Sequence, residues 1–394
     1  MKKQILIASY PLNAGGTTTS LISLLHNIDY KSYEVDLILL RQKGEFLQHI
    51  PSQVNLLEPA LLEGSNLKDK LYKLVNYTLK GIFIKKLMYL IKKKPYSLGI
   101  FQIMSGYGWA SVSRGLKKQY DVAIGFMEGW PNIYVSKKVR ANKKIAWVHP
   151  DYKNSGLDPS LDAPIFKCFN KIVLVSQSCK NSFDQGFSQY TDKTIVIENI
   201  VSVEHVKRMA EAEVDDFIIE DGCLNIITAA RLRNSDKGLD RAVKALKRLK
   251  ADGYKIRWYV LGEGEDRQLL EDMIREYGLE KDFILMGQRS NPYPYIKRAD
   301  LYALTSRYEG KPISVTEAQV LGVGVVTTKY ISANEQIDDG VDGIIVENND
   351  EAIYDGIKRI LDNPELLNIF SENLKNKTIG NADEINKLYE AMKN

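Results

Sequence analysis

The sequence has 394 residues, a formal net charge of +4, and 44% hydrophobic and 26% charged residues. At about 100–200 residues per domain, this length predicts two globular domains with a sizeable buried core. The composition excludes a small disulfide-stabilised scaffold, a collagen-like chain and an intrinsically disordered chain.

The cysteines and the apolar runs indicate the compartment. Cys168, Cys179 and Cys223 show no CxxC spacing and cannot all pair, which excludes a disulfide framework and a zinc site and favours a reducing compartment. No apolar run reaches the roughly 18 uncharged residues of a spanning helix. Pro11 and two glycines interrupt the first apolar run too early for a signal peptide. We therefore expect a cytoplasmic protein.

Short apolar runs alternate with helical patterns along the chain, which predicts βαβ units and parallel sheets. The runs are apolar on both faces, as strands covered by helices on both sides require. In the first half, strands are predicted at 4–9, 34–40, 121–126, 143–149, 171–176 and 194–198, with a helix at 21–28. In the second half they are predicted at 224–229, 256–261, 283–286, 301–305, 323–328 and 344–347, with helices at 239–251 and 266–277.

A polar, acid-rich segment, 199–221, separates the two series of strands. We therefore predict an α/β architecture of two Rossmann-like, doubly wound domains, 1–200 and 201–376, that face each other across a central cleft. Asn363 and Pro364 are typical of the N-cap and first position of a helix. A C-terminal segment, 377–394, is predicted to carry a further helix at 382–393 and to pack back on the first domain.

The first candidate for chemistry is Gly15 and Gly16, between the first predicted strand and the following helix. Glycines let a backbone approach a ligand closely, and the free amides at a helix N-terminus attract anions. The segment has neither the lysine of a Walker loop nor a GxGxxG pattern. A plain strand-to-helix turn remains the alternative.

The second candidate is the pair of cations Arg231 and Lys237, between a strand end and a helix. Ligands in open α/β sheets bind at the carboxyl edge of the sheet, where two cations suit a diphosphate. The alternative is an ion-paired arginine and a solvated lysine. Gly262 and Gly264, after the next strand, are weak evidence on their own.

The most specific pattern runs from residue 307 to residue 318 and holds Glu309 and Glu317, eight positions apart. Glu309 is predicted to end a strand, Gly310 to permit an unusual turn, and Pro312 to begin a helix that carries Glu317. Carboxylates accept hydrogen bonds from hydroxyl pairs, and amides at a helix N-terminus bind oxygen atoms or phosphate. The pattern predicts a receptor for a sugar and a ribose; two solvent-facing glutamates are the alternative.

The Glu-Gly-x-Pro-x-x-x-x-Glu-Ala pattern resembles the E-x7-E motif of family 4 glycosyltransferases, which are retaining enzymes with the GT-B fold. The early Gly-Gly loop, the Arg-x5-Lys-Gly segment, LGEGED and IDDGVDGIIVENND follow in the family's order over nearly the whole chain. The resemblance implies transfer of a hexose or N-acetylhexosamine from a nucleotide diphosphate sugar, most commonly a UDP-sugar. The implied acceptor is a lipid-linked or polysaccharide glycan of the bacterial cell surface.

The resemblance also implies a role for each candidate residue. Glu309 would contact donor-sugar hydroxyls, Glu317 would hold the ribose, and Arg231 with Lys237 would neutralise the diphosphate. His149, at the end of a predicted strand, would lie near the donor sugar, and a core histidine is the alternative. His26, His49 and His205 are expected to be structural or surface residues. The backbone of the remaining residues would line the sugar and phosphates: Gly15, Gly16, Gly310, Lys311, Pro312 and Ile313.

Lys311, Ser314 and Thr316 depart from the family pattern, because relatives carry less polar residues there. The sequence has no Asp-x-Asp pair, so we expect neither a metal ion nor another cofactor, and the cations would stabilise the leaving group. Retention of configuration is expected, with the departing phosphate accepting the acceptor's proton.

A lysine-rich stretch, 66–95, carries nine lysines from Lys68 to Lys94 against one acidic residue, Asp69. Apolar residues between the lysines predict an amphipathic segment that binds an anionic membrane surface, on the inner face of the cell membrane. A solvated helix face is the alternative, and nucleic acid is not expected as a partner. The rival functions are a GT-B sugar-nucleotide epimerase and a non-catalytic relative that binds nucleotide sugars.

Overall fold

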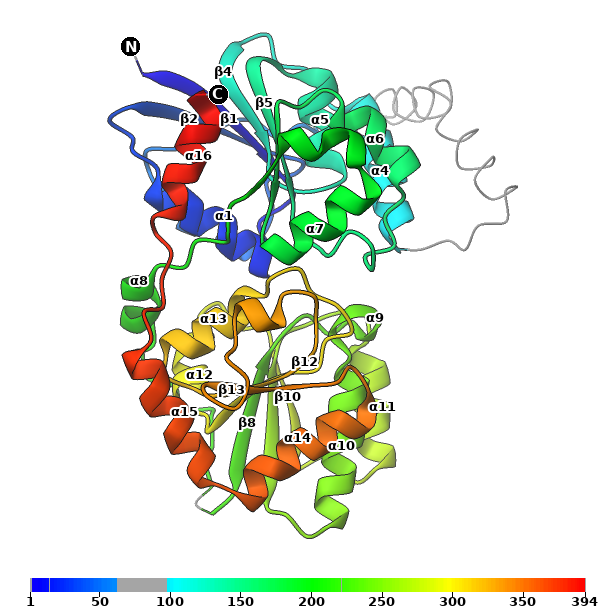
Figure 1. Cartoon of the computed structure of the whole chain (residues 1–394), viewed down its shortest axis with the longest axis vertical. Coiled ribbons are helices and arrows are strands. Elements are labelled where there is room, and N and C mark those ends of the chain that lie inside the picture. Colours follow the sequence, from blue (N-terminus) through cyan, green and yellow to red (C-terminus); the bar gives the residue numbers. More distant parts are fainter. Residues whose placement is uncertain (1, 14, 62–97, 221, 394) are drawn as a thin grey trace, which may run out of the picture. The chain divides into compact units, whose positions relative to one another are not determined.

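The computed structural model describes residues 2–13, 15–61, 98–220 and 222–393, and the lysine-rich stretch lies outside these ranges. The chain divides into two compact units, Met1–Glu198 with Asp383–Asn394, and Asn199–Ala382 (Figure 1). The chain thus crosses between units at 198/199 and 382/383, where the sequence analysis set boundaries at 200/201 and 376/377. Each unit is built around one parallel sheet.

The first unit contains a seven-stranded parallel sheet with the order β3-β2-β1-β4-β5-β6-β7. The strand order reverses at β1, which pairs with β2 on one side and with β4 on the other. Such a reversal leaves a crevice outside the carboxyl ends of β1 and β4. The strands are β1 (Lys3–Ser9), β2 (Tyr33–Leu39), β3 (Asn55–Leu56), β4 (Gln119–Gly125), β5 (Arg140–Val148), β6 (Lys171–Leu174) and β7 (Thr194–Val196).

The last helix of the chain, α16, packs against the first unit. The Tyr389 ring stacks on Tyr33 with ring centroids 5.1 Å apart, and the Glu384 carboxylate accepts a hydrogen bond of 2.8 Å from the Glu198 backbone N–H. The helices of this unit are α1 (Gly16–Asn27), η1 (Glu45–His49), α4 (Leu98–Val112), α5 (Trp130–Lys138), α6 (Pro159–Phe166), α7 (Gln177–Gly186), η2 (Ser188–Lys193) and α16 (Glu384–Lys393).

The second unit contains a six-stranded parallel sheet with the order β10-β9-β8-β11-β12-β13. Its strands are β8 (Leu224–Ala229), β9 (Ile256–Leu261), β10 (Phe283–Gly287), β11 (Leu301–Leu304), β12 (Val325–Thr328) and β13 (Gly343–Val346). Its helices are α8 (Val203–Met209), α9 (Asn234–Lys237), α10 (Leu239–Ala251), α11 (Arg267–Glu276), α12 (Tyr293–Arg298), α13 (Ile313–Val320), η3 (Ala333–Glu335), α14 (Asp350–Asp362) and α15 (Glu365–Asn376).

Consecutive residues of the second sheet enter separate hydrophobic clusters because side chains alternate along a strand. Trp258 and Val260 of β9 pack in the cluster that holds Leu246 of α10. Tyr259, between them, packs in the cluster that holds Val315 of α13. Both faces of the sheet are therefore covered, which explains the continuous apolar runs in the sequence.

The predicted strands are all present, with ends that differ by at most three residues. The two-residue strand β3 was not predicted, and the segment 199–221 contains α8. The prediction for Asn363 and Pro364 is wrong by one position: Pro364 is the N-cap of α15, and the Asn363 side chain donates to the Arg359 carbonyl of α14. Among the described residues no helix combines the length and the apolar character needed to cross a bilayer.

Candidate active site

Glu309 lies in the loop that joins β11 to α13, and one of its carboxylate oxygens is held by two donors. The Lys237 ammonium group and the Ser306 hydroxyl group each donate to Oε1 at 2.6 Å. The Lys237 and Glu309 side chains are 23% and 12% exposed, so the ion pair is largely enclosed. The other oxygen, Oε2, accepts no hydrogen bond from the described residues, so its acceptor capacity is unused by them. The structure thus brings two predicted site residues into direct contact.

Arg307 explains how two segments that are distant in the sequence meet. Its backbone N–H donates to the Asp236 carbonyl at 2.6 Å, and its guanidinium group donates to the Asn234 carbonyl at 3.0 Å and to Asp240 at 2.7 Å. α9 and α13 consequently lie at the same end of the sheet (Figure 1). That end is the carboxyl edge of β8 and β11, where ligands bind in sheets of this kind.

Arg231 follows β8 at the same edge, and its side chain is exposed. The neighbouring Arg233 forms an ion pair with Asp236. Arg231 forms no ion pair or side-chain hydrogen bond with any residue of the described ranges. Its charge is therefore available to an anionic ligand.

The two glycines of LGEGED have a packing explanation. A Cβ atom on Gly262 would lie 1.9 Å from the Ala230 carbonyl oxygen, and one on Gly264 would lie 2.3 Å from the Leu232 carbonyl oxygen. These glycines let the loop after β9 lie against the loop after β8. The loop after β9 therefore packs directly against the backbone on both sides of Arg231.

Glu317 lies on α13 and is 6% exposed. The Tyr293 hydroxyl of α12 donates to its Oε1 at 2.8 Å. Burial raises the pKa of Glu317 to about 7, and the hydrogen bond from Tyr293 opposes that rise. Its Oε2, like that of Glu309, accepts no hydrogen bond from the described residues.

Side chains from elsewhere in the unit hold the loop between the two glutamates. Ser332 donates to the Gly310 carbonyl, Asn199 to the Lys311 carbonyl at 3.2 Å, and Gln336 to the Pro312 carbonyl at 3.1 Å. Ser332 and Gln336 are buried. Sequence reasoning missed both, and polar residues between apolar ones were the available signal.

Two expectations for this loop are wrong in detail. Glu309 does not end a strand, because β11 ends at Leu304. Pro312 is the N-cap of α13, and Ile313 is the first helical residue; a shift of one position is common at helix ends.

In the first unit, Gly15 and Gly16 lie at the start of α1, which begins five residues before the predicted helix at 21–28. Gly15 is the N-cap, and no side chain caps the helix. A Cβ atom on Gly16 would meet nothing within 4 Å. Among the described residues, therefore, no side chain caps this helix and no atom fills the space beside Gly16.

His149 follows β5 and is half-buried. Its Nε2–H donates to the Phe126 carbonyl at 3.1 Å, so Nδ1 is left with the acceptor lone pair. Burial lowers the pKa of His149 to about 4, and the ring is neutral at physiological pH. In keeping with the structural role expected of His26, its ring bonds to the His49 carbonyl at 3.1 Å.

Glu128, which sequence reasoning missed, lies beside His149. Glu128 is 5% exposed. Its carboxylate accepts hydrogen bonds from the Gln102 side chain at 3.2 Å and from the His149 backbone N–H at 3.4 Å. It follows β4, next to the crevice where the strand order reverses. The polar Glu-Gly-Trp-Pro-Asn segment after an apolar strand was the available signal.

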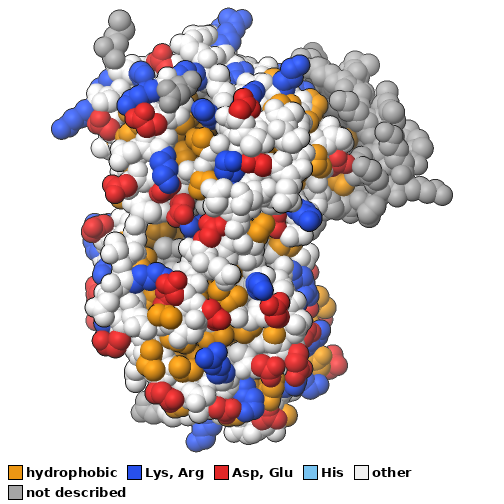
Figure 2. All heavy atoms as spheres, viewed as in Figure 1, with side chains coloured by type: hydrophobic (Ala, Val, Ile, Leu, Met, Phe, Trp, Pro, Cys, Tyr) orange, Lys and Arg blue, Asp and Glu red, His pale blue; other side chains and the backbone are white. Residues whose placement is uncertain are grey.

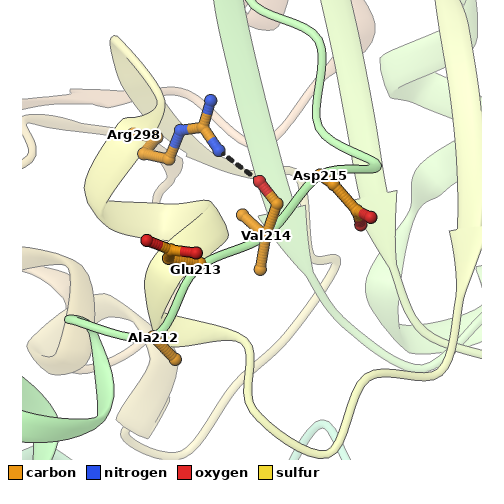
Figure 3. Close-up of a pocket in the computed structure, with 5 residues that line it drawn as sticks. All are labelled: Ala212, Glu213, Val214, Asp215 and Arg298. Carbon is orange, nitrogen blue, oxygen red and sulfur yellow. Dashed lines mark hydrogen bonds between the residues drawn. The ribbon is translucent and has the colours of Figure 1, made fainter.

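Two further features bear on the choice of site. A cavity of about 540 Å³ is lined by Ala212, Glu213, Val214, Asp215 and Arg298, and Arg298 donates to the Val214 carbonyl at 2.7 Å (Figure 3). The predicted site residues do not line it.

Within the described ranges no group of three or more His, Cys, Asp or Glu side chains is placed to hold a metal ion. On the drawn face of the molecule, acidic and basic side chains are interspersed (Figure 2).

Residues 212–377 match the family model described as glycosyl transferases group 1. The second unit is a group 1 glycosyltransferase domain. Its limits include Arg231, Lys237, Glu309 and Glu317, so the resemblance drawn from these residues is confirmed.

Two curated relatives of this domain have names that describe transfer to a lipid-linked glycan. An N-acetylgalactosamine-N,N'-diacetylbacillosaminyl-diphospho-undecaprenol 4-alpha-N-acetylgalactosaminyltransferase of Campylobacter jejuni is 29% identical over 216 residues, covering 53% of this chain and 56% of that protein. A UDP-Gal:alpha-D-GlcNAc-diphosphoundecaprenol alpha-1,3-galactosyltransferase of Escherichia coli is 29% identical over 33% of this chain and 35% of that protein. The chain spans about half the length of each of the first curated relatives that it matches.

Solved structures match over the whole chain. A glycosyltransferase of Rickettsia africae covers 100% of this chain and 98% of its own, with a TM-score of 0.66 and 18% identity. Anabaena HepE in complex with UDP covers 99% of this chain and 98% of its own, with a TM-score of 0.66 and 15% identity. These matches confirm the GT-B fold with two parallel-sheet α/β units.

Proposed function

We propose that the protein is a retaining glycosyltransferase that moves a hexose or N-acetylhexosamine from a UDP-sugar to a lipid-linked or polysaccharide acceptor in bacterial cell-surface glycan synthesis. The observation that carries the proposal is the contact between Lys237 and Glu309 at the carboxyl edge of the second sheet, with Arg231 just after β8 and Glu317 on the helix after β11. The printed names of the relatives support the acceptor class, and one of those names specifies a UDP-sugar donor.

Each proposed role follows from the contacts of the residue. Arg231 has a charge without an internal partner, and Lys237 lies close by in sequence, so both would face the diphosphate. Glu309 and Glu317 each have one carboxylate oxygen that is held by a hydrogen bond and one that accepts none from the described residues, which suits acceptance of a hydroxyl hydrogen bond from the donor sugar and from the ribose. The backbone from Gly310 to Ile313 would line the space between them.

The reaction would break the bond between the anomeric carbon and the diphosphate oxygen. The acceptor oxygen would form its bond to the same face of that carbon, and its proton would pass to the departing diphosphate. The sequence has no Asp-x-Asp pair, and we propose that Arg231 and Lys237 stabilise the developing negative charge without a metal ion. From the first unit, Gly15 and Gly16 would contact the phosphates, and neutral His149 would contact the donor sugar.

We further propose that the enzyme works on the inner face of the cell membrane. The nine lysines of the stretch 66–95 would bind anionic lipid, and apolar residues between them would enter the interface. This placement suits an acceptor that is itself anchored in lipid.

The test is calorimetric titration with UDP, UDP-sugars and uridine, with and without EDTA, together with a transfer assay. Glu309→Gln should abolish transfer and leave UDP affinity within a few fold. Arg231→Ala combined with Lys237→Ala should weaken UDP much more than uridine, because only UDP carries the diphosphate.

The matched control is Lys250→Ala, since Lys250 forms a comparable ion pair of 2.9 Å with Asp282, just before β10 and thus away from the carboxyl edge. That variant should bind UDP normally. Binding of UDP without any turnover would favour the non-catalytic alternative, and absence of UDP binding would refute the donor assignment.

A further inference from the structure

We infer that Tyr293 is a positioning residue for the donor nucleotide: it fixes one oxygen of Glu317 and thereby aims the other at the ribose hydroxyls. The inference rests on the proposed function, because it takes the ribose as the ligand of Glu317. It adds a residue outside the E-x7-E segment and assigns it a measurable effect on ribose selectivity.

The Tyr293 ring is buried among apolar side chains. The residue is 7% exposed and packs in a cluster with Val206, Ile313 and Val320. Its backbone N–H donates to the Asn291 side chain at 3.3 Å at the start of α12. The ring is thus held by apolar contacts, and its hydroxyl reaches Glu317 Oε1 at 2.8 Å.

A phenol differs from a cation as a partner for a buried carboxylate. No lysine or arginine in the described ranges pairs with Glu317. The titratable groups that face it are Tyr293 from α12 and Tyr302 from β11, and His205 from α8 lies edge-on to Tyr293 with ring centroids 6.3 Å apart. Tyr293 therefore orients the carboxylate without adding a positive charge.

The protonation state of Glu317 then sets how well it accepts ribose hydroxyls. Burial raises the pKa of Glu317 to about 7, and the hydrogen bond from Tyr293 lowers it. The ionised carboxylate is the form that accepts hydrogen bonds at both oxygens. Preference for ribose should consequently rise as pH increases through about 7, and loss of the Tyr293 hydroxyl should move the midpoint to higher pH.

The experiment measures dissociation constants of UDP and 2′-deoxy-UDP by calorimetry from pH 5.5 to 8.5. The dissociation constant of 2′-deoxy-UDP divided by that of UDP reports the ribose contact. The titration of the phosphates cancels in this ratio, because both nucleotides carry the same diphosphate. In the wild-type protein the ratio should rise with pH. Tyr293→Phe should lower the ratio at pH 7 about tenfold, as expected for a lost hydrogen bond to a charged group, and Glu317→Gln should make it independent of pH.

Two controls separate positioning from packing. Tyr295→Phe removes a hydroxyl two residues away that bonds to Asp216 at 2.8 Å, and it should leave the ratio and the midpoint unchanged. His205→Gln should do the same. An equal loss of UDP and 2′-deoxy-UDP affinity in Tyr293→Phe, or an unchanged midpoint, would overturn the inference while leaving the donor assignment intact. Failure of the wild-type protein to bind either nucleotide would overturn both.

Discussion

Gly238 offers the sharpest test of how the two donor-site segments are joined. It has φ +60° and ψ 33°, separates α9 from α10, and directly follows Lys237. Its carbonyl accepts a hydrogen bond of 3.0 Å from the Thr305 hydroxyl, four residues before Glu309. A Cβ atom placed there would lie 2.4 Å from the Thr305 carbonyl oxygen. Gly238→Ala therefore disturbs both the backbone conformation and the contact between the segments.

The expected cost has two parts. A left-handed conformation costs an alanine about 1–2 kcal/mol. The clash involves a backbone oxygen, which cannot rotate away, and relieving such overpacking costs about 1–3 kcal/mol more. Gly278→Ala is the matched control, because Gly278 has φ +67° and a Cβ atom there would meet nothing within 4 Å. The control should show only the first cost.

The assay is hydrogen exchange of β8, which reports opening of the second unit, combined with UDP titration. The extra loss of about 1–3 kcal/mol in the free energy of unfolding also lowers the melting temperature. For a domain of this size, we expect Gly238→Ala to melt about 2–12 °C below Gly278→Ala. Gly238→Ala should also weaken UDP binding, because it displaces Lys237 from Glu309, and the control should not. Equal stability and equal UDP affinity in the two variants would refute the reasoning.

Two further predictions concern the first unit and the membrane. Burial raises the pKa of Asp162 to about 7, so the folded state retains a proton that the unfolded state releases near pH 4, and this group lowers the free energy of unfolding as pH rises from about 4 to about 7. Asp162→Asn should flatten that decline in urea denaturation, and an unchanged pH dependence would contradict the assignment. Replacing Lys85, Lys86, Lys92, Lys93 and Lys94 with glutamate should abolish sedimentation with anionic vesicles; retained sedimentation would mean that another surface binds them.

Sequence patterns predicted the strands and the order of the motifs because these depend on local chemistry. The run 224–229 coincides with β8 and the run 256–261 with β9, since strands buried on both faces must be apolar throughout. The pair Asn55–Leu56 escaped prediction, because two residues carry no periodicity. α8 escaped it for a related reason: it has only seven residues, and four of them are charged or titratable, within an acid-rich segment.

The site could be predicted only as a set of residue types. The spacing of Glu309 and Glu317 pointed to a ligand, but the residues that hold them come from distant parts of the chain. Lys237 lies 72 positions from Glu309, and Tyr293 lies 24 positions from Glu317. Such pairings depend on strand order and helix packing, which no local pattern encodes.

The topology of the second sheet explains why these pairings converge. β8 pairs with β9 on one side and with β11 on the other, so the loops after β8 and β11 are neighbours although about 70 residues separate them. α9, which follows β8, supplies Lys237, the loop after β11 supplies Glu309, and Arg307 joins the two segments through its backbone. The ion pair with Lys237 holds Glu309, which we propose contacts the donor sugar, whereas the neutral phenol of Tyr293 holds Glu317, which we propose contacts the ribose. Burial raises the pKa of Glu317 to about 7, and Tyr293 adds no positive charge that would oppose protonation, so the preference for ribose over 2′-deoxyribose should change as pH passes through that value.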